Sequence, residues 1–399
     1  MLAWLMIGGG IHGTYLAHLL TTAKGVSREQ LRVLDPHPEP LARWNRLTAN
    51  TGMAYLRSPA VHNLGLIADA LDTFAASPAA WVYRTYREPY SRPGYALFQA
   101  HAHQIVREHG LADLWLQGSA QRLIKHSNGW QVETTAGALM AQRVLLAVGR
   151  TELNWPTWAT ALREQHPTAP LHHTFEDHFT LAALPSALHT VVIGGGSTAA
   201  QVACTLAESV APTNGRVTRR VTLLLRHPIR LAHFDSDPCW NGPKCLSQFH
   251  HTTDYAARRA QIASGRHRGS MPPDVARLLD LHGTSGTLHR HEGEVQRAQV
   301  ITGGMIELTL GTGDSLVADR VLLATGFVQS RPGGALVAQA IADYGLPCAP
   351  CGYPIVDKQL CWRDGLYVTG PLAELELGAT APNIRGARLA GERLPASEQ

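Results

Sequence analysis

The stretch Leu5-Met6-Ile7-Gly8-Gly9-Gly10-Ile11-His12-Gly13 lies close to the N-terminus of a chain of 399 residues. It begins inside a short apolar run that predicts a buried parallel strand, and it continues into apolar residues at helical spacing. In such a strand–turn–helix unit Gly8 allows the tight turn and Gly10 lets the backbone approach a pyrophosphate, while Gly13 lets helix and strand pack closely. The helix N-terminus offers unpaired N–H groups to the phosphates.

The second predicted strand, Leu31–Asp35, supports this interpretation. It ends in an acidic residue about 20 residues beyond the glycines, where a carboxylate hydrogen-bonds a ribose hydroxyl. The turn and the acid together predict a dinucleotide site. The alternative is a glycine-rich turn that binds no ligand.

A second copy of the unit follows in the middle of the chain. The apolar residues 190–193 lead into Gly194-Gly195-Gly196-Ser197-Thr198-Ala199 and then into a predicted helix. The matching second strand, residues 221–225, ends in Arg226 rather than in an acid, with Arg230 close behind. Because arginine accommodates a 2′-phosphate where an acid takes the free hydroxyl, this site favours NADPH over NADH. The alternative is two solvated arginines at a strand end.

Composition narrows the function classes. Hydrophobic residues make up 45% of the chain and charged residues 17%, as in globular proteins, and the net charge of +4 is spread along the sequence. We therefore expect no nucleic-acid partner and no membrane partner. The six cysteines lack the spacing of a disulfide framework and indicate a reducing cytoplasm. The 21 histidines are scattered and predict no metal site.

Two such units, with a strand and a helix returning late, predict an α/β fold of two Rossmann-like three-layer dinucleotide-binding domains. The NADPH domain, residues 185–318, is inserted in a split FAD domain of residues 1–165 and 319–399. Residues 154–185 predict a crossover linker, and a last helix is expected over residues 379–394. FAD is assigned to the first unit because paired dinucleotide sites are typical of hydride exchange between a held flavin and a nicotinamide.

The candidate cofactor-binding residues come from the two turns, the strand ends and an early tryptophan. They are Gly8, Gly10, Ile11, His12, Gly13, Asp35, Trp44, Gly149, Gly194, Gly196, Ser197, Thr198, Ala199, Arg226, Arg230, Thr325, Gly326, Gly370, Pro371 and Gly378.

The two glycine motifs, together with Ala324-Thr325-Gly326-Phe327 and the stretch 365–370, resemble those of flavoproteins with two dinucleotide folds. Within these flavoproteins the chain is similar to class B flavin monooxygenases, in particular to the lysine/ornithine N-hydroxylase-like branch. Trp44 resembles a tryptophan of that branch. This resemblance implies that NADPH reduces FAD and that O2 then forms a C4a-peroxyflavin, which oxygenates N, S or C of a small-molecule substrate. The sequence lacks the FxGxxxHxxx(W/Y) fingerprint of the wider class.

The candidate catalytic residues are Arg57, His62 and Asn63, in an aperiodic segment that resembles the flavin-facing loop of that branch. Arg57 would balance negative charge near the flavin, and His62 would hydrogen-bond there. A surface salt bridge and a helix-capping histidine are the alternatives for these two residues.

Two further functions stay open at this point. Cys348-Ala349-Pro350-Cys351 is a C-x-x-C sequence, which is typical of disulfide or other acceptor reductases. Such reductases place the pair beside a glycine motif, however, and here Cys204 is alone on the second helix. The other alternative is a flavoprotein redox sensor without turnover of a small molecule.

Overall fold

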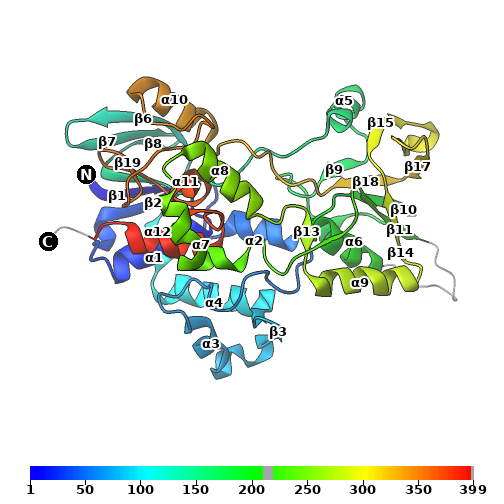
Figure 1. Cartoon of the computed structure of the whole chain (residues 1–399), viewed down its shortest axis with the longest axis horizontal. Helices are drawn as coiled ribbons and strands as arrows, with labels where there is room; N and C mark the ends of the chain where they lie inside the picture. The colour runs from blue at the N-terminus through cyan, green and yellow to red at the C-terminus, as the bar shows by residue number, and fades with distance from the viewer. Residues whose placement is uncertain (210–218, 397–399) are drawn as a thin grey trace.

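The computed structural model describes residues 1–209 and 219–396, which form two α/β domains side by side (Figure 1). The first domain is built on a sheet whose central strands are parallel, and β1 pairs with both β2 and β8. The strand order is β19 (Cys361–Arg363), β20 (Leu366–Val368), β8 (Gly137–Leu146), β1 (Leu2–Ile7), β2 (Leu31–Asp35) and β5 (Trp115–Gln117), with β6 (Ala120–His126) and β7 (Gly129–Thr134) as a hairpin on β8.

The second domain contains a five-stranded parallel sheet. Its order is β14 (Leu288–Glu292), β11 (Arg220–Leu225), β10 (His189–Ile193), β18 (Arg320–Leu323) and β9 (Leu171–His173). An antiparallel sheet of β15 (Val295–Val300), β16 (Ile306–Leu310) and β17 (Ser315–Ala318) lies beside it. Both large sheets therefore have the topology that the two glycine motifs predict.

Helices flank both sheets. In the first domain α1 (Ile11–Thr22) packs on α12 (Ile384–Arg393), and α10 (Gly334–Tyr344) packs on β6; in the second domain α6 (Ser197–Glu208) packs on α9 (Pro273–Thr284). The other helices are α2 (Ala42–Ala49), α3 (Ala70–Ala75), α4 (Tyr95–Glu108), α5 (Thr157–Gln165), α7 (Pro243–His251), α8 (Tyr255–Ser264) and α11 (Glu374–Leu377). None of the helices in residues 1–209 and 219–396 has the length and apolar character needed to cross a lipid bilayer.

The structure corrects two expectations about element boundaries. The segment expected as a linker holds α5 and β9, and the second sheet also takes in β18, so the second domain extends beyond residues 185–318 at both ends. β9 has only three residues and shows no period of its own. The last helix begins at Ile384 rather than at residue 379, because Gly378 has a φ of +77° and Pro382 interrupts the segment.

Residues 230–271, here called the insert, leave the second domain and pack on the first. The insert starts at β12 (Arg230–Leu231), ends at β13 (Ser270–Met271) and carries α7 and α8 between these paired strands. Its apolar side chains Trp240, Leu246, Phe249 and Ile262 belong to the core of the first domain. Figure 1 shows α7 and α8 lying next to α11 and α12.

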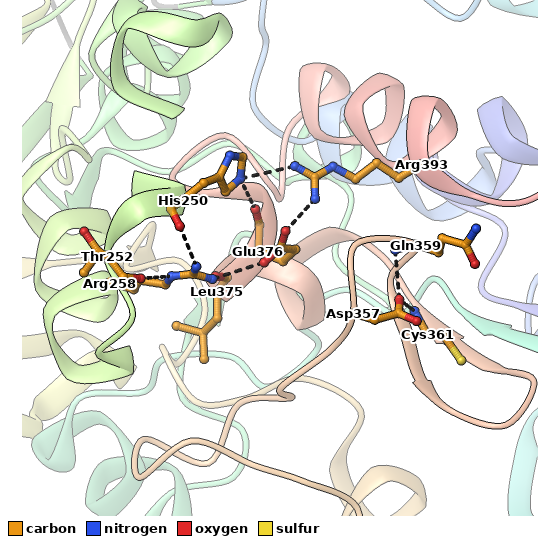
Figure 2. A network of polar contacts seen from close by, with 9 residues as sticks. All are labelled: His250, Thr252, Arg258, Asp357, Gln359, Cys361, Leu375, Glu376 and Arg393. Atoms are coloured by element: carbon orange, nitrogen blue, oxygen red, sulfur yellow. Dashed lines mark hydrogen bonds and ion pairs between the residues drawn. The ribbon is translucent and has the colours of Figure 1, made fainter. Parts of the chain in front are cut away.

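A polar network centred on Glu376 fixes the insert in place (Figure 2). The Glu376 carboxylate accepts from Arg258 of α8 at 3.1 Å and from Arg393 of α12 at 2.6 Å. The backbone carbonyl of Glu376 lies 3.0 Å from Nε2 of His250 in α7. Three helices are therefore joined at one residue of α11.

The structure also contains a disulfide that the cysteine spacing did not predict. It joins Cys239 and Cys245 within the insert and closes a short loop around Trp240. The Trp240 carbonyl accepts from the Thr380 hydroxyl at 3.3 Å, so this loop touches the segment before α12. The expectation of six reduced cysteines is therefore corrected at this pair.

Arg92 and Asp274 form a buried ion pair between the two domains, with an N–O distance of 2.7 Å and an Arg92 side chain that is 2% exposed. We expect Asp274→Asn to lower the free energy of unfolding by about 3 kcal/mol, because it leaves a buried guanidinium without its carboxylate. Chemical denaturation measures the change. Asp280→Asn on the same helix is the control: Asp280 pairs with Arg290 at the surface, and its loss should cost less than about 1 kcal/mol. Equal effects would contradict the prediction.

Candidate active site between the two domains

The first glycine turn has the geometry that a pyrophosphate requires. Gly8 has a φ of +110°, and a Cβ on Gly13 would overlap the Gly8 carbonyl oxygen, so both positions need glycine. A Cβ on Gly10 would meet no protein atom within 4 Å. The space above Gly10 is therefore open to a ligand at the N-terminus of α1, where Ile11 and His12 begin the helix.

Asp35 lies at the end of β2, beside this turn. One carboxylate oxygen accepts from the Gly9 N–H at 2.6 Å and the other from the His37 N–H at 2.8 Å. The side chain is half-buried, and each oxygen keeps a lone pair for a further donor. The carboxylate is thus held in place, and it can accept from a ribose hydroxyl.

The second glycine turn repeats the first with small differences. Gly194 has a φ of +155°, and a Cβ there would lie 2.9 Å from the Cβ of Ala199, which takes the place of the third glycine. A Cβ on Gly196 would lie 3.6 Å from the Cα of Gly269 in the insert. Ser197 donates to the Ser270 carbonyl at 3.2 Å. The insert therefore contacts the turn directly.

A cavity of about 1220 Å³ joins the two domains. Its wall in the second domain includes the turn 194–198, Arg226, Thr325 and Gly326, and its wall in the first domain includes parts of α2 and the start of α12. The cavity lies where the second sheet ends, as expected for a nucleotide site of this fold.

Trp44 of α2 anchors the apolar wall of the cavity. Its ring packs on Tyr95 and Phe98, with centroid distances of 5.7 Å and 5.3 Å. Met53 and Leu56 continue this wall. Trp44 therefore lies at the cavity, and its contact with a cofactor stays a prediction.

Arg57 also lines the cavity, but its guanidinium is already engaged. It pairs with Asp235 at 2.7 Å and donates to the carbonyls of Ala232 and Phe234 at 2.8 Å and 2.7 Å and to the Ser270 hydroxyl at 3.1 Å. These acceptors lie in the neck of the insert, defined here as residues 232–236 and 266–270. Arg57 holds the neck against the first domain, and its catalytic role stays a prediction.

His62 and Asn63 lie away from the cavity wall. Burial lowers the pKa of His62 to about 4, so the imidazole is neutral at pH 7. Asn63 is fully buried; its amide donates to the carbonyls of Ala60 and Ala68, and its oxygen accepts from the Gly65 N–H. The structure thus shows Asn63 fixing its own loop, and none of the contacts in the described part of the chain joins either side chain to Trp44. Their catalytic roles stay predictions.

His12 joins the first glycine turn to the closing segment of the first domain. Its ring nitrogens lie 2.9 Å from the Thr369 hydroxyl and 3.1 Å from the Asn383 carbonyl. Burial lowers the pKa of His12 to about 4. Gly370, with a φ of +63°, and the buried Pro371 follow Thr369. Asn383 lines the cavity, so His12 positions that wall through its side chain.

Basic side chains gather beside the second turn. Arg226 lines the cavity and is exposed, whereas Arg230 lines a smaller adjoining pocket of about 520 Å³. Arg268 of the neck lines both spaces, and it was not among the residues predicted from the sequence. Among the described residues, Arg226, Arg230 and Arg268 form no ion pair, so all three can meet a phosphate.

A buried carboxylate behind the cavity wall was also missed by sequence reasoning. Glu374 is fully buried and pairs with Arg259, with Arg266 at 2.5 Å and with Arg150 at 3.8 Å. Burial alone would raise the pKa of Glu374, but Arg266 and Arg259 hold it below its usual value. Arg150 and Arg266 line the cavity. The sequence gives no local signal for this cluster, because its members are distant in the chain.

The remaining predicted glycines mark strand ends and close contacts. Gly149 follows β8 and is exposed, and Gly326 has a φ of +74° beside Thr325, whose hydroxyl donates to the Asn154 carbonyl at 2.5 Å. Gly378 does not face the cavity, since a Cβ there would lie 2.7 Å from the Trp240 ring.

The sequence matches no protein-family model and no functionally curated protein. Solved structures share the fold over nearly the whole chain. A cadaverine monooxygenase of desferrioxamine biosynthesis from Erwinia amylovora, bound to FAD, is 16% identical with a TM-score of 0.73, covering 100% of this chain and 97% of that one. An ornithine N-hydroxylase from Kutzneria sp. 744, in a structure with reduced FAD, NADP+ and L-ornithine, is 14% identical with a TM-score of 0.72, covering 98% and 97%.

A third solved structure, a bacillithiol disulfide reductase from Bacillus cereus, is 17% identical with a TM-score of 0.59, covering 98% of this chain and 97% of that one. At these identities the similarity establishes the fold. It confirms the prediction of an α/β protein with two dinucleotide-binding domains.

The open space above Gly10 gives a test of the first site. We expect Gly10→Leu to fold normally and to bind FAD about tenfold more weakly or worse, because the side chain fills the pyrophosphate position. A tenfold weaker affinity corresponds to roughly 1.4 kcal/mol of binding free energy. Flavin absorbance per protein measures the loss. Gly242→Leu is the control, since a Cβ at Gly242 also meets no atom within 4 Å but lies in the insert. Full FAD content in Gly10→Leu would contradict the assignment.

The basic residues predict a ranked effect on nicotinamide binding. We expect Arg226→Ala to weaken NADPH binding about tenfold and NADH binding little, because the guanidinium would pair with the 2′-phosphate. Arg230→Ala should have a smaller effect, since Arg230 does not line the cavity. Fluorescence titration with both nucleotides measures the constants. Equal losses for NADPH and NADH would favour solvated arginines instead.

Proposed function

We propose that this chain, which has the fold of flavin-dependent amine monooxygenases, is itself an FAD- and NADPH-dependent monooxygenase. It would transfer one atom of O2 to a nucleophilic nitrogen of a small molecule, with sulfur and carbon as the wider class. The second oxygen atom would leave as water, with the electrons supplied by NADPH.

The cavity between the domains carries this proposal. It is bounded by the second glycine turn on one side and by Trp44, Met53 and the start of α12 on the other. A nicotinamide held by the second turn and a flavin held by the first domain would both reach this space. One shared cavity is the arrangement that hydride transfer between two dinucleotides requires.

The residues of the first domain fit FAD. The open Gly10 turn would bind the pyrophosphate, and Asp35 would accept from a ribose hydroxyl. The N-terminus of α12, whose Asn383 and Ile384 line the cavity, would stabilise negative charge on the reduced flavin. Bound FAD would supply hydride acceptance from NADPH and activation of O2.

The residues of the second domain and the neck fit NADPH. Ser197 and Thr198 start α6 at the second turn, and Arg226 and Arg268 supply positive charge for a 2′-phosphate. The apolar wall of Trp44 and its neighbours would exclude water from the reacting groups. Arg57 would keep the neck closed over this space.

Among the possible nucleophiles an amine is favoured by the solved structures of similar fold, because the two monooxygenases reported above are named for cadaverine and ornithine. Asp235, which lines the cavity and is half-exposed as a side chain, offers a carboxylate to an ammonium group. It already compensates Arg57, so it would be shared between the two cations.

Product analysis under labelled O2 tests the proposal. Purified protein with FAD and NADPH should consume NADPH faster with a small diamine or amino acid such as cadaverine or ornithine, and the product should carry one labelled oxygen. Mass spectrometry of the product and the ratio of hydrogen peroxide to NADPH consumed are the readouts, with Gly10→Leu as the flavin-poor control. Reduction of a disulfide without O2, or NADPH use unaffected by amines and thioethers, would contradict a monooxygenase.

A further inference from the structure

Residues 347–355 form a hairpin that carries two free thiols. Cys348 and Pro354 form an antiparallel β-bridge, and the Ala349 N–H donates to the Tyr353 carbonyl at 2.9 Å. The Gly352 N–H donates to the Ala349 carbonyl at 2.8 Å and closes the turn. Cys351 lies at the tip of this turn and is exposed, whereas Cys348 lies in the hairpin arm and is half-buried. The two thiols therefore share one turn but differ in access to solvent.

Arginines surround the hairpin tip. Nη2 of Arg259 lies 3.6 Å from the Cys351 sulfur, and Nη1 of Arg331 donates to the Gly352 carbonyl at 3.3 Å. The carboxylate that pairs with Arg259, Glu374, is shared with Arg266 and Arg150. The thiol that is exposed to solvent is therefore also the one beside the Arg259 guanidinium, and cysteine attacks as the thiolate.

We propose that this hairpin is a peroxide-reactive dithiol site, in which Cys351 is the attacking thiol and Cys348 the second one. The Cys351 thiolate attacks one oxygen of hydrogen peroxide, the O–O bond breaks, and a sulfenic acid forms with release of hydroxide, which takes up a proton. The Cys348 sulfur then attacks the Cys351 sulfur, the S–O bond breaks, and a second water leaves. Overall, two thiols and one peroxide give one disulfide and two waters.

The surroundings of Cys348 fit the second role. Burial raises the pKa of the Cys348 thiol, while Arg331 beside it acts in the opposite direction. Cys348 therefore stays protonated and shielded while Cys351 faces solvent, and the C-x-x-C spacing allows the two sulfurs to join. Neither step requires FAD or NADPH, so the site is independent of the proposed monooxygenase activity.

The hairpin is also connected to the cavity wall. The Arg259 guanidinium lies over the Tyr353 ring at 4.0 Å and pairs with Glu374, which holds Arg266 at the cavity. The Tyr353 hydroxyl accepts from Arg150, another cavity residue, at 3.3 Å. The hairpin is therefore connected to two arginines of the cavity, to Arg150 through Tyr353 and to Arg266 through Arg259 and Glu374.

The other free thiols provide matched controls. Cys361 is half-buried, its N–H donates to Asp357 at 2.8 Å (Figure 2), and burial raises the pKa of its thiol. Cys204 is buried in α6, and burial raises the pKa of its thiol to about 12. Neither thiol has a described arginine contact.

Peptide mapping after peroxide treatment tests the proposal. The full-length FAD-loaded protein is reduced with dithiothreitol, freed of it, and treated with stoichiometric hydrogen peroxide before thiol alkylation. We expect a Cys348–Cys351 disulfide to form at least about tenfold faster than oxidation of Cys361 or Cys204. Oxidation of Cys351 at the same rate as Cys361, with no disulfide to Cys348, would overturn the proposal.

Two variants separate the roles of the residues. Cys348→Ser should leave a sulfenic acid on Cys351 that dimedone labels, because the second thiol is missing. Arg259→Gln should slow the oxidation of Cys351 about tenfold and Arg259→Lys much less, because lysine keeps the charge. Dimedone labelling of Cys361 rather than Cys351, or equal rates in Arg259→Gln and Arg259→Lys, would overturn the assignment.

Discussion

The buried carboxylate of Glu374 is the constraint on which the arrangement of the cavity depends. An ionised carboxylate without partners costs several kcal/mol in a protein interior, so its arginines are obligatory. Arg259 lies on α8, Arg266 follows that helix, and Arg150 follows β8. One buried charge therefore brings the insert, the first sheet and α11 together at the cavity wall. Glu376 on the same helix pairs with Arg258 of α8 and Arg393 of α12, and so adds further contacts between the insert and the first domain.

The two glycine turns show how one motif serves two sites. A Cβ on Gly9 would contact the Trp115 ring at the start of β5, and a Cβ on Gly195 would contact the His227 ring just after β11, so each turn is covered by a ring. The third position differs, because only glycine fits at residue 13 while the second turn accepts Ala199. The neck of the insert covers the second turn, whereas the space above Gly10 is open.

Sequence reasoning located the elements whose signals are local. The strands β1 and β2, both glycine turns and the charge difference between Asp35 and Arg226 follow from short, contiguous patterns. The short strand β9 carries no period, and it pairs with β18, which lies far along the chain, so the segment before residue 185 gave no sign of its place in the second sheet. The Glu374 cluster and Arg268 were missed for a related reason: an arginine in sequence does not reveal its partner. The disulfide at Cys239 joins two helical segments whose proximity the sequence does not specify.

The insert restricts the movement of the two domains relative to each other. Because its helices are part of the core of the first domain while its neck touches the second glycine turn, the two domains are tied at a third place besides the two chain crossings. A hinge rotation would have to separate Arg57 from the neck, Arg92 from Asp274 and the neck from its own helices, all at once. Rotation of one domain against the other is therefore resisted at the insert as well as at the two chain crossings.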